Sequence, residues 1–287
     1  MIQRALLFFR AYSSLLFRLS GAIPALLAFN GAISALAFAP FHYQFLAVIG
    51  FSGFFYHLSH LSDSKTAFSH GWFFGAGFNV ISLYWIGNSF SAVGLWYLAP
   101  LGNICLPLLL AFFPAVIAAL TVKISTTKTG RFFAFCLFWS LSEWAKGWLF
   151  TGFPWTLVGY IWDLPILQFT AFAGIYGLSA VTIFLIASLG LQRLSFAGIS
   201  LLIFACLWIS GKYRLSHYIK EETGINMRIV QASIPQKEKW LLEHFEDNLK
   251  KWVALSNLES ERPLKAIIWS ESSIPTFVAD YPAIRQI

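Results

Sequence analysis

Charged residues are scarce in this sequence, at 11% of 287 positions, whereas an ordinary soluble domain carries roughly 25%. This scarcity excludes a soluble globular enzyme over most of the length. Three cysteines in 287 positions exclude a secreted disulfide scaffold. Hydrophobic residues make up 57% of the chain and aromatic residues 18%, with a mean hydropathy of +0.66. This composition excludes a disordered chain and predicts a multi-pass α-helical membrane protein.

The few charges are unevenly distributed along the chain. Residues 1–211 contain nine Lys/Arg and three Asp/Glu, whereas residues 212–287 contain eleven and ten. We therefore expect a transmembrane helical domain over 1–211, a linker over 212–224 and a water-facing domain over 225–287. The net charge of +7 is spread over loops and tail. We accordingly expect no nucleic-acid partner.

Seven apolar runs approach the ~20 residues that a helix needs to cross a bilayer. They cover about 20–40, 43–60, 68–89, 95–121, 132–150, 164–189 and 195–211. The stretch ahead of the first run contains Arg4, Arg10 and Arg18 and has the basic start of a signal peptide. Because six further apolar runs follow, we expect this stretch to be retained rather than cleaved.

The basic residues of the short loops predict the orientation, because positively charged loops stay in the cytoplasm. Eight Lys/Arg precede the first run or follow the second, fourth and sixth. The alternate loops, near 41–43, 90–94 and 151–163, contain none. Seven crossings from a cytoplasmic N-terminus place the tail on the outer face. In a bacterium, this predicts an inner-membrane protein with a periplasmic C-terminal domain.

Several residues within the apolar runs have a structural explanation. Gly71 and Gly75 have the small-xxx-small spacing of close helix packing. The cysteines, Cys105, Cys136 and Cys206, each lie in an apolar run, and we expect them to be small buried hydrophobic residues. The six histidines show no metal-ligand spacing, so no metal site is expected.

The end of the fifth run and the segment after it leave two alternatives open. Glu143 and Lys146 are three residues apart, so they form either a structural ion pair or part of a lipid or substrate pocket. The segment 151–163 combines Trp155 and other aromatic rings with almost no charge. It is either an ordinary aromatic belt at the membrane surface or a surface that meets lipid as substrate.

The tail has the pattern of a strand, a helix and a second strand. Residues 226–232 are rich in β-branched residues, 237–260 have a helical period, and 264–269 form a short apolar run that predicts a buried strand. The crossover makes the two strands parallel. Glu271 follows the second strand, at the end where such units place functional groups.

Four segments together resemble the apolipoprotein N-acyltransferase family. They are the second half of 31–40 (GAISALAFAP), 147–155 (GWLFTGFPW), 229–240 (IVQASIPQKEKW) and 267–275 (IIWSESSIP), in the family's order. The resemblance implies a membrane domain followed by the start of an α/β nitrilase-type (carbon–nitrogen hydrolase) sandwich domain. It also implies transfer of an acyl chain from a phospholipid to the N-terminal S-diacylglyceryl-cysteine of an apolipoprotein, through a cysteine thioester and without a cofactor.

The resemblance assigns roles residue by residue. Glu271 takes the position of the family's general base, and Trp240 corresponds to a tryptophan that the family places near the site, where we expect it to contact substrate. Trp155 is the further substrate-binding candidate, from the aromatic segment 151–163. Ser270 stands where the family usually has proline. The family's catalytic Lys and nucleophilic Cys follow its Glu motif, whereas this sequence ends at Ile287. We therefore expect both to be absent and the chain to be inactive alone, as a gene remnant, a partial record or one half of a split enzyme with a separate C-terminal half.

Two other functions fit the sequence less fully. Seven spans with few intramembrane charges are compatible with a membrane transporter or channel-like protein, although the tail motifs would then be coincidental. A non-catalytic lipid-binding or lipoprotein-binding protein would use the aromatic outer segment without turnover.

Overall fold

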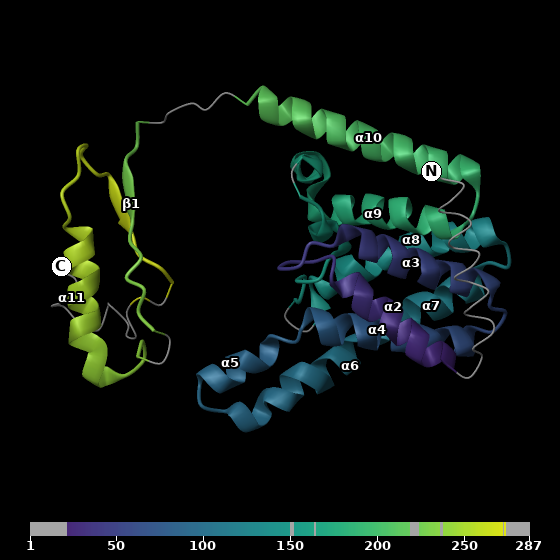
Figure 1. Ribbon diagram of the computed structural model, residues 1–287, viewed down its shortest axis with the longest axis horizontal. Helices are drawn as coiled ribbons and strands as arrows, with labels where there is room; N and C mark the ends of the chain where they lie inside the picture. The colour runs from purple at the N-terminus through teal and green to yellow at the C-terminus, as the bar shows by residue number, and fades with distance from the viewer. Residues whose placement is uncertain are drawn as a thin grey trace. The chain divides into compact units, whose positions relative to one another are not determined.

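A computed structural model describes residues 22–149, 152–163, 165–218, 224–235, 238–271 and 273. The chain divides into two compact units, one made of Met1–Asn88 with Tyr97–Tyr218 and the other of Ser89–Trp96 with Ile219–Ile287. The first unit contains a helical bundle, and the second contains a small α/β structure (Figure 1). The predicted basic stretch with Arg4, Arg10 and Arg18 lies outside the described residues.

The helices of the first part of the chain follow one another through short links. In chain order they are α2 (Ile23–Ala35), α3 (Gln44–His60), α4 (Ser64–Ser82), α5 (Ile86–Ala92), η2 (Trp96–Leu98), η3 (Leu101–Cys105), α6 (Leu106–Leu110), α7 (Phe112–Ile124), α8 (Lys128–Lys146), η5 (Val158–Ile161), η6 (Ile166–Phe169), α9 (Thr170–Gly190) and α10 (Leu194–Ser216). Helices α2, α3, α4, α7, α8 and α9 form the bundle, and α10 packs along α9 (Figure 1).

Three helical stretches within the described ranges are long and apolar enough to cross a membrane. They are Trp96–Ile124, Ile166–Gly190 and Leu194–Ser216, and Ile23–Ala35 is a shorter apolar helix. These three correspond to the fourth, sixth and seventh predicted runs. The second, third and fifth runs also form helices, α3, α4 and α8. The fold is therefore that of a helical membrane protein, and the number of seven crossings stays a prediction.

Small residues bring α4 close to α7, as the spacing of Gly71 and Gly75 predicted. A Cβ atom at Gly71 would lie 2.5 Å from the carbonyl oxygen of Pro114, and one at Gly75 would lie 2.9 Å from the Cα of Ala111. Neither position can hold a larger side chain without moving backbone. The helix-packing interpretation of these two glycines is confirmed.

A second pair of glycines brings α2 against the other side of α4. A Cβ atom at Gly31 would lie 1.9 Å from the carbonyl oxygen of Phe74, and one at Gly77 would lie 1.8 Å from that of Ala28. Each helix therefore places one glycine against the backbone of the other. Two helices that approach this closely gain dispersion contacts along their whole interface.

The bundle core is built largely from phenylalanine rings. Phe54 and Phe74 stack with their centroids 4.1 Å apart and their planes within 5°. The largest fully buried side chains include Phe51, Phe54, Phe55, Phe74, Phe132 and Phe135. Edge-to-face and offset contacts between aromatic rings add to the stability gained from burial.

The prediction that all three cysteines are buried is wrong. Cys105 and Cys206 are exposed on the protein surface, and Cys136 is half-buried. The physical reason is that lipid tails are as apolar as a protein core, so an apolar run in a membrane helix gives no signal for which face packs inward.

Arg131 caps the C-terminal end of α3 from a helix that is distant in the sequence. This side chain belongs to α8, is only 6% exposed, and donates from Nη1 to the carbonyl oxygen of Ser59 at 3.1 Å and to those of Leu58 and Leu61. Its Nε donates to the carbonyl of Ser125 at 2.7 Å. The sequence analysis counted Arg131 as a loop charge, whereas its guanidinium donates hydrogen bonds to carbonyls at the end of α3, where the last turn of a helix leaves acceptors unsatisfied.

The second unit contains the predicted strand–helix–strand arrangement. Strands β1 (Met227–Ile229) and β2 (Ala266–Ile268) pair in parallel, with Met227 opposite Ala266. Between them lie η7 (Leu242–His244) and helix α11 (Phe245–Ser256). The parallel pair is confirmed, although both strands and the helix are shorter than predicted.

One face of this unit is packed and one is open. Trp252 of α11 is 3% exposed and stacks on Trp269 at a centroid distance of 5.4 Å, and the indole of Trp269 donates to Ser256 Oγ at 2.8 Å. Ile267 and Ile268 are each 44% exposed. The prediction that 264–269 is buried is therefore wrong over these positions, because a single helix covers only part of a two-stranded sheet.

Candidate functional site

Two of the four motif segments meet at one cavity of the helical unit. The cavity has a volume of about 330 Å³ and is lined by residues from three stretches of chain: Ala35–Phe41, Ile81–Trp85 and Trp155–Tyr160. The first stretch follows α2, the second follows α4, and the third lies between α8 and α9. The predicted site residue Trp155 is therefore part of a defined cavity.

Stacked aromatic rings form one wall of this cavity. Trp155 stacks on Trp85 with centroids 4.9 Å apart and planes within 6°, and Phe153 stacks on Trp155 at 5.2 Å. The ring of Trp155 is 55% exposed. An exposed indole that is held flat by two neighbours offers a rigid amphipathic surface to an apolar ligand with a polar end. Sequence reasoning missed Trp85, whose only signal was its place at the end of an apolar run.

The segment after α8 is anchored inside the bundle rather than lying on it. Leu157, Val158 and Ile161 are fully buried. The backbone N–H of Val158 donates to Glu143 Oε1 at 2.8 Å, and the indole of Trp139 donates to the same oxygen at 3.1 Å. This segment is thus a folded part of the bundle that presents Trp155.

Glu143 and Lys146 do not form the ion pair that their spacing permitted, since neither has a salt bridge in the described part of the chain. Glu143 is 1% exposed and faces the bundle, where it accepts the two N–H groups just described. Lys146 lines a different, apolar cavity. Although residues three apart lie on neighbouring positions of a helix, the Glu143 carboxylate is held by the two N–H groups and the Lys146 side chain lies in the apolar cavity.

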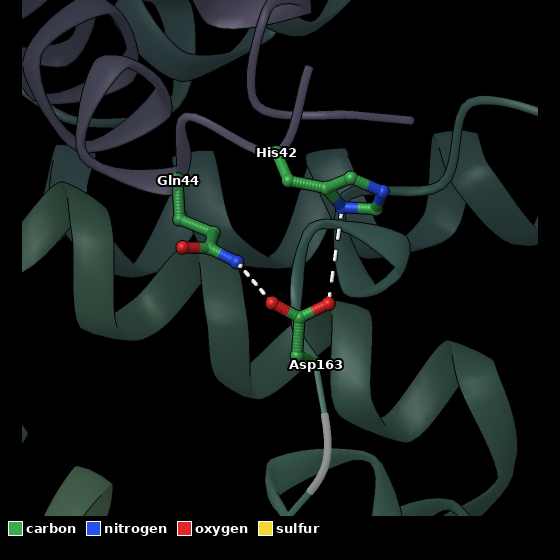
Figure 2. A network of polar contacts seen from close by, with 3 residues as sticks. All are labelled: His42, Gln44 and Asp163. Atoms are coloured by element: carbon green, nitrogen blue, oxygen red, sulfur yellow. Dashed lines mark hydrogen bonds and ion pairs between the residues drawn. The ribbon is translucent and has the colours of Figure 1, made fainter. Parts of the chain in front are cut away.

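A polar network holds the far end of the same segment. Asp163 accepts a hydrogen bond from Gln44 Nε2 at 2.8 Å and lies 3.8 Å from His42 Nδ1, and Figure 2 shows the three side chains converging. Gln44 is the first residue of α3, and His42 belongs to the loop before it. The loop between α2 and α3 is thereby tied to the segment that carries Trp155.

The other two predicted site residues lie in the second unit. Glu271 is exposed three residues after β2, in a turn in which Ser273 N donates to Ser270 O at 3.2 Å. The ammonium of Lys239 donates to the backbone carbonyl of Glu271 at 3.0 Å and lies 5.9 Å from the ring centroid of Trp240. Lys239 therefore links the two predicted residues, Glu271 and Trp240, at one end of the parallel pair.

Metal-binding geometry is not found in the described ranges. No group of three or more His, Cys, Asp or Glu side chains is close enough there to hold an ion. His57 and His70 form a pair, with Nε2 and Nδ1 2.8 Å apart.

These features define a helical membrane protein with an aromatic cavity and a parallel α/β unit in which an exposed glutamate, Glu271, follows the second strand. The family profile described as "Apolipoprotein N-acyltransferase N-terminal domain" matches residues 30–189. This range includes the end of α2 from Asn30, the helices from α3 to all but the last residue of α9, and every stretch that lines the aromatic cavity. The chain belongs to the apolipoprotein N-acyltransferase family.

Curated relatives support the same assignment. An apolipoprotein N-acyltransferase of Rickettsia bellii is 33% identical over 266 residues, which cover 89% of this chain and 52% of the relative. That of Rickettsia prowazekii is 34% identical over 85% of this chain and 51% of its own length, and that of Caulobacter vibrioides is 28% identical over 91% and 51%. The chain thus spans about half the length of the curated relatives it matches. These matches do not favour the transporter hypothesis.

Proposed function

We propose that this chain supplies the membrane domain and the first part of the catalytic domain of a lipoprotein N-acyltransferase. The reaction would transfer an acyl chain from a phospholipid to the α-amino group of an S-diacylglyceryl-cysteine. The observation that carries the proposal is that two family-like segments, 36–40 and 147–155, both contribute to one aromatic cavity, the first through Phe38–Pro40 and the second through Trp155. Its support is the family profile over 30–189 and the names of the relatives.

Glu271 is proposed as the general base. A cysteine thiol becomes a nucleophile when a nearby base takes its proton. The resulting thiolate attacks the ester carbonyl of the phospholipid, and the ester bond breaks to leave a lysophospholipid and a thioester. The amine of the lipoprotein then attacks the thioester, which releases the thiolate. Glu271 lies at the carboxyl end of β2, where parallel α/β units place their functional groups.

The nucleophile is proposed to come from polypeptide outside these 287 residues. Residues 212–287 contain no cysteine, and Cys105, Cys136 and Cys206 belong to helical segments of the membrane unit. The lysine that would stabilise the tetrahedral oxyanion is proposed to come from outside these residues as well, because no lysine of this chain matches the family's position for it. We therefore expect no thioester from the chain alone.

Trp155 and Trp240 are proposed to contact substrate. Trp155 offers an exposed ring at the mouth of the aromatic cavity, and Trp240 is 53% exposed beside Lys239. Indole rings partition to the headgroup level of a bilayer, where a phospholipid ester lies. The proposed topology has seven crossings, a cytoplasmic N-terminus and a periplasmic C-terminal domain in a bacterial inner membrane. The α/β unit is proposed as the start of a nitrilase-type sandwich.

A complementation experiment tests this function. Cells depleted of their own lipoprotein N-acyltransferase receive the chain alone or with the reading frame immediately downstream, and mass spectrometry follows N-acylation of a lipoprotein. We expect acylation only with the second frame. Glu271→Gln is expected to abolish it, whereas Glu261→Gln, at another exposed glutamate of the same unit, leaves it unchanged. Acylation by the chain alone would refute the external nucleophile, and activity of the Glu271 variant would refute its role as base.

The non-catalytic alternative predicts a different result. A lipid-binding or lipoprotein-binding protein would retain a diacylglyceryl peptide without acylating it in any of these strains. Binding of that peptide by the purified chain, with no acylation when the downstream frame is present, would replace the enzyme proposal.

A further inference from the structure

The turn that carries Glu271 has little support of its own. Glu271 is exposed and comes three residues after the end of β2. Among the described residues, one backbone hydrogen bond closes the turn, and the N–H of Ser273 donates it to the carbonyl oxygen of Ser270 at 3.2 Å. Holding a residue in one backbone conformation costs entropy that a single hydrogen bond at the surface does not offset. A carboxylate that takes a proton at a defined place therefore needs a further contact.

Lys239 supplies a contact of this kind. Its ammonium donates a hydrogen bond to the backbone carbonyl oxygen of Glu271 at 3.0 Å, from 32 residues earlier in the chain. Because the donor is charged, this hydrogen bond is stronger than one between neutral groups. The ammonium also lies 5.9 Å from the ring centroid of Trp240, near the outer limit of about 6 Å for a cation–π contact. The hydrogen bond to Glu271 is therefore the stronger of these contacts.

The backbone around Lys239 is itself held in place. The N–H groups of Glu238 and Lys239 both donate to the carbonyl oxygen of Pro235, at 2.9 and 3.1 Å. Earlier in the same segment, Val230 and Ala232 are 4% and 1% exposed and belong to the small hydrophobic core of the α/β unit. A lysine on this segment can therefore tie the exposed turn to the packed core.

The parallel pairing of the strands brings the two segments together. Because β1 and β2 run in the same direction, the segments that follow them leave the sheet at the same edge. The N–H of Val230, directly after β1, donates to the carbonyl oxygen of Ile268, the last residue of β2, at 2.9 Å. Lys239 and Glu271 thus join two segments that start from adjacent strand ends.

The hydrogen bond from Lys239 leaves the carboxylate of Glu271 available. It goes to the main-chain oxygen, and the ion pairs among the described residues do not include Glu271. This distinction matters because a carboxylate that is paired with an ammonium keeps its negative charge more firmly and is a poorer proton acceptor. A lysine on the adjacent carbonyl orients the side chain without this penalty.

We propose that Lys239 is a positioning residue for the general base of acyl transfer. Its ammonium fixes the main chain of Glu271, so that the carboxylate meets the incoming thiol at hydrogen-bond distance. This inference rests on the proposed function of Glu271. A displacement of about 1 Å can slow a reaction on the order of 100-fold, so the loss of this hydrogen bond affects the rate without removing a group that reacts.

The contact is tested first without acyl transfer. Endoproteinase Glu-C cuts after glutamate, and the bond after Glu271 contains the carbonyl that Lys239 holds. Its cleavage in the full 287-residue chain in detergent micelles measures how often the turn opens. Lys239→Met should raise this cleavage roughly threefold to tenfold, as expected for loss of a partly exposed hydrogen bond to a charged group. Lys239→Arg should leave it unchanged, as should Lys251→Met at an exposed lysine of α11.

Cleavage after Glu261 is the internal reference. This exposed glutamate lies in the same unit, between α11 and β2. An equal rise after Glu261 and Glu271 in Lys239→Met would show a general loosening of the unit and would overturn a specific role for Lys239. Unchanged cleavage after Glu271 in this variant would overturn the contact itself.

The rate of N-acylation tests the positioning role. The chain is co-purified with the product of the downstream frame and assayed with phosphatidylethanolamine as donor and a diacylglyceryl peptide as acceptor. Lys239→Met should lower kcat on the order of 10- to 100-fold and leave both KM values within about twofold, because the contact serves the reacting group and not substrate binding. Lys239→Arg should retain most of the rate, and Lys251→Met all of it.

The outcomes separate this inference from the proposed function. A raised KM with unchanged kcat in Lys239→Met would assign Lys239 to substrate binding and overturn the positioning role. Unchanged kcat in this variant, with an active unaltered enzyme, would refute the role of Lys239 alone. If the unaltered chain and its downstream partner give no acylation, the proposed function fails, and the positioning role fails with it.

Discussion

The close contact of α2 with α4 allows a quantitative prediction from two glycines. In Gly31→Ala, the new Cβ would lie 1.9 Å from the carbonyl oxygen of Phe74, whereas ordinary contacts begin near 3.4 Å. That oxygen belongs to the backbone of α4 and cannot rotate away. The two helices must therefore separate by about 1.5 Å, the difference between these distances.

The magnitude follows from that displacement. Overpacking of a core costs about 1–3 kcal/mol. A gap of roughly 0.5–1 Å already forfeits a quarter to a half of a dispersion contact, and here a whole interface with stacked phenylalanine rings would be opened. We therefore expect the upper end, about 3 kcal/mol of lost unfolding free energy, for Gly31→Ala and for Gly77→Ala.

Gly198 of α10 provides the matched control. A Cβ atom there meets nothing within 4 Å. Gly198→Ala should raise the unfolding free energy by about 0.5–1 kcal/mol, because glycine is a poor helix former. The assay is denaturant unfolding of the chain in micelles, followed by tryptophan fluorescence. If Gly31→Ala falls within about 0.5 kcal/mol of the Gly198 variant, the argument from the close contact is refuted.

Three further predictions use other contacts. Glu143→Leu leaves the N–H of Val158 without its acceptor, which should lower the free energy of opening of that amide by about 1–3 kcal/mol in hydrogen exchange, whereas Glu143→Gln should not. Arg131→Ala should lower the unfolding free energy by about 1–3 kcal/mol, and unchanged stability would contradict its role as a cap. Hydrogen bonds from Thr66 to the Asp63 carboxylate, which caps α4, lower the pKa of Asp63 below its ordinary 3.8. The stability that this cap contributes is therefore complete above pH 3.8 and is lost as the pH falls through the folded pKa. A midpoint at or above 3.8 in an NMR titration of this carboxyl would contradict the prediction.

Features of the fold that depend on short stretches of sequence could be predicted from residue spacing and periodicity. The parallel pairing of β1 with β2 follows from β-branched runs on either side of a helical period, because such a connection has one favoured hand. Gly71 and Gly75 likewise signalled a helix contact through their spacing alone. Element ends were predicted less well, since prolines such as Pro107 divide one apolar run into several helical pieces.

The aromatic cavity could not be predicted, for a different reason. Trp85 and Trp155 are 70 residues apart, and their stacking depends on how the bundle brings together the segments that follow α4 and α8, which neither local sequence reports. One of the two partners of Glu143 is the main-chain N–H of Val158, which no spacing between side-chain types could identify; the other is the indole of Trp139, one helical turn earlier. The spacing of three residues suggested Lys146 as the partner of Glu143. Spacing along a helix identifies residues on the same helical face, but it does not identify contacts with other segments of the chain.

The contact of Arg131 with the end of α3 has a consequence for biosynthesis. The carbonyls that it satisfies belong to residues about 70 positions earlier in the chain. At roughly 5–20 residues per second, a ribosome adds the intervening chain in about 4–14 s. During that interval the last turn of α3 has left the ribosome without its cap and must be stabilised by water, lipid headgroups or the insertion machinery. The first helices of the bundle therefore reach their final arrangement only when the beginning of α8 has been made.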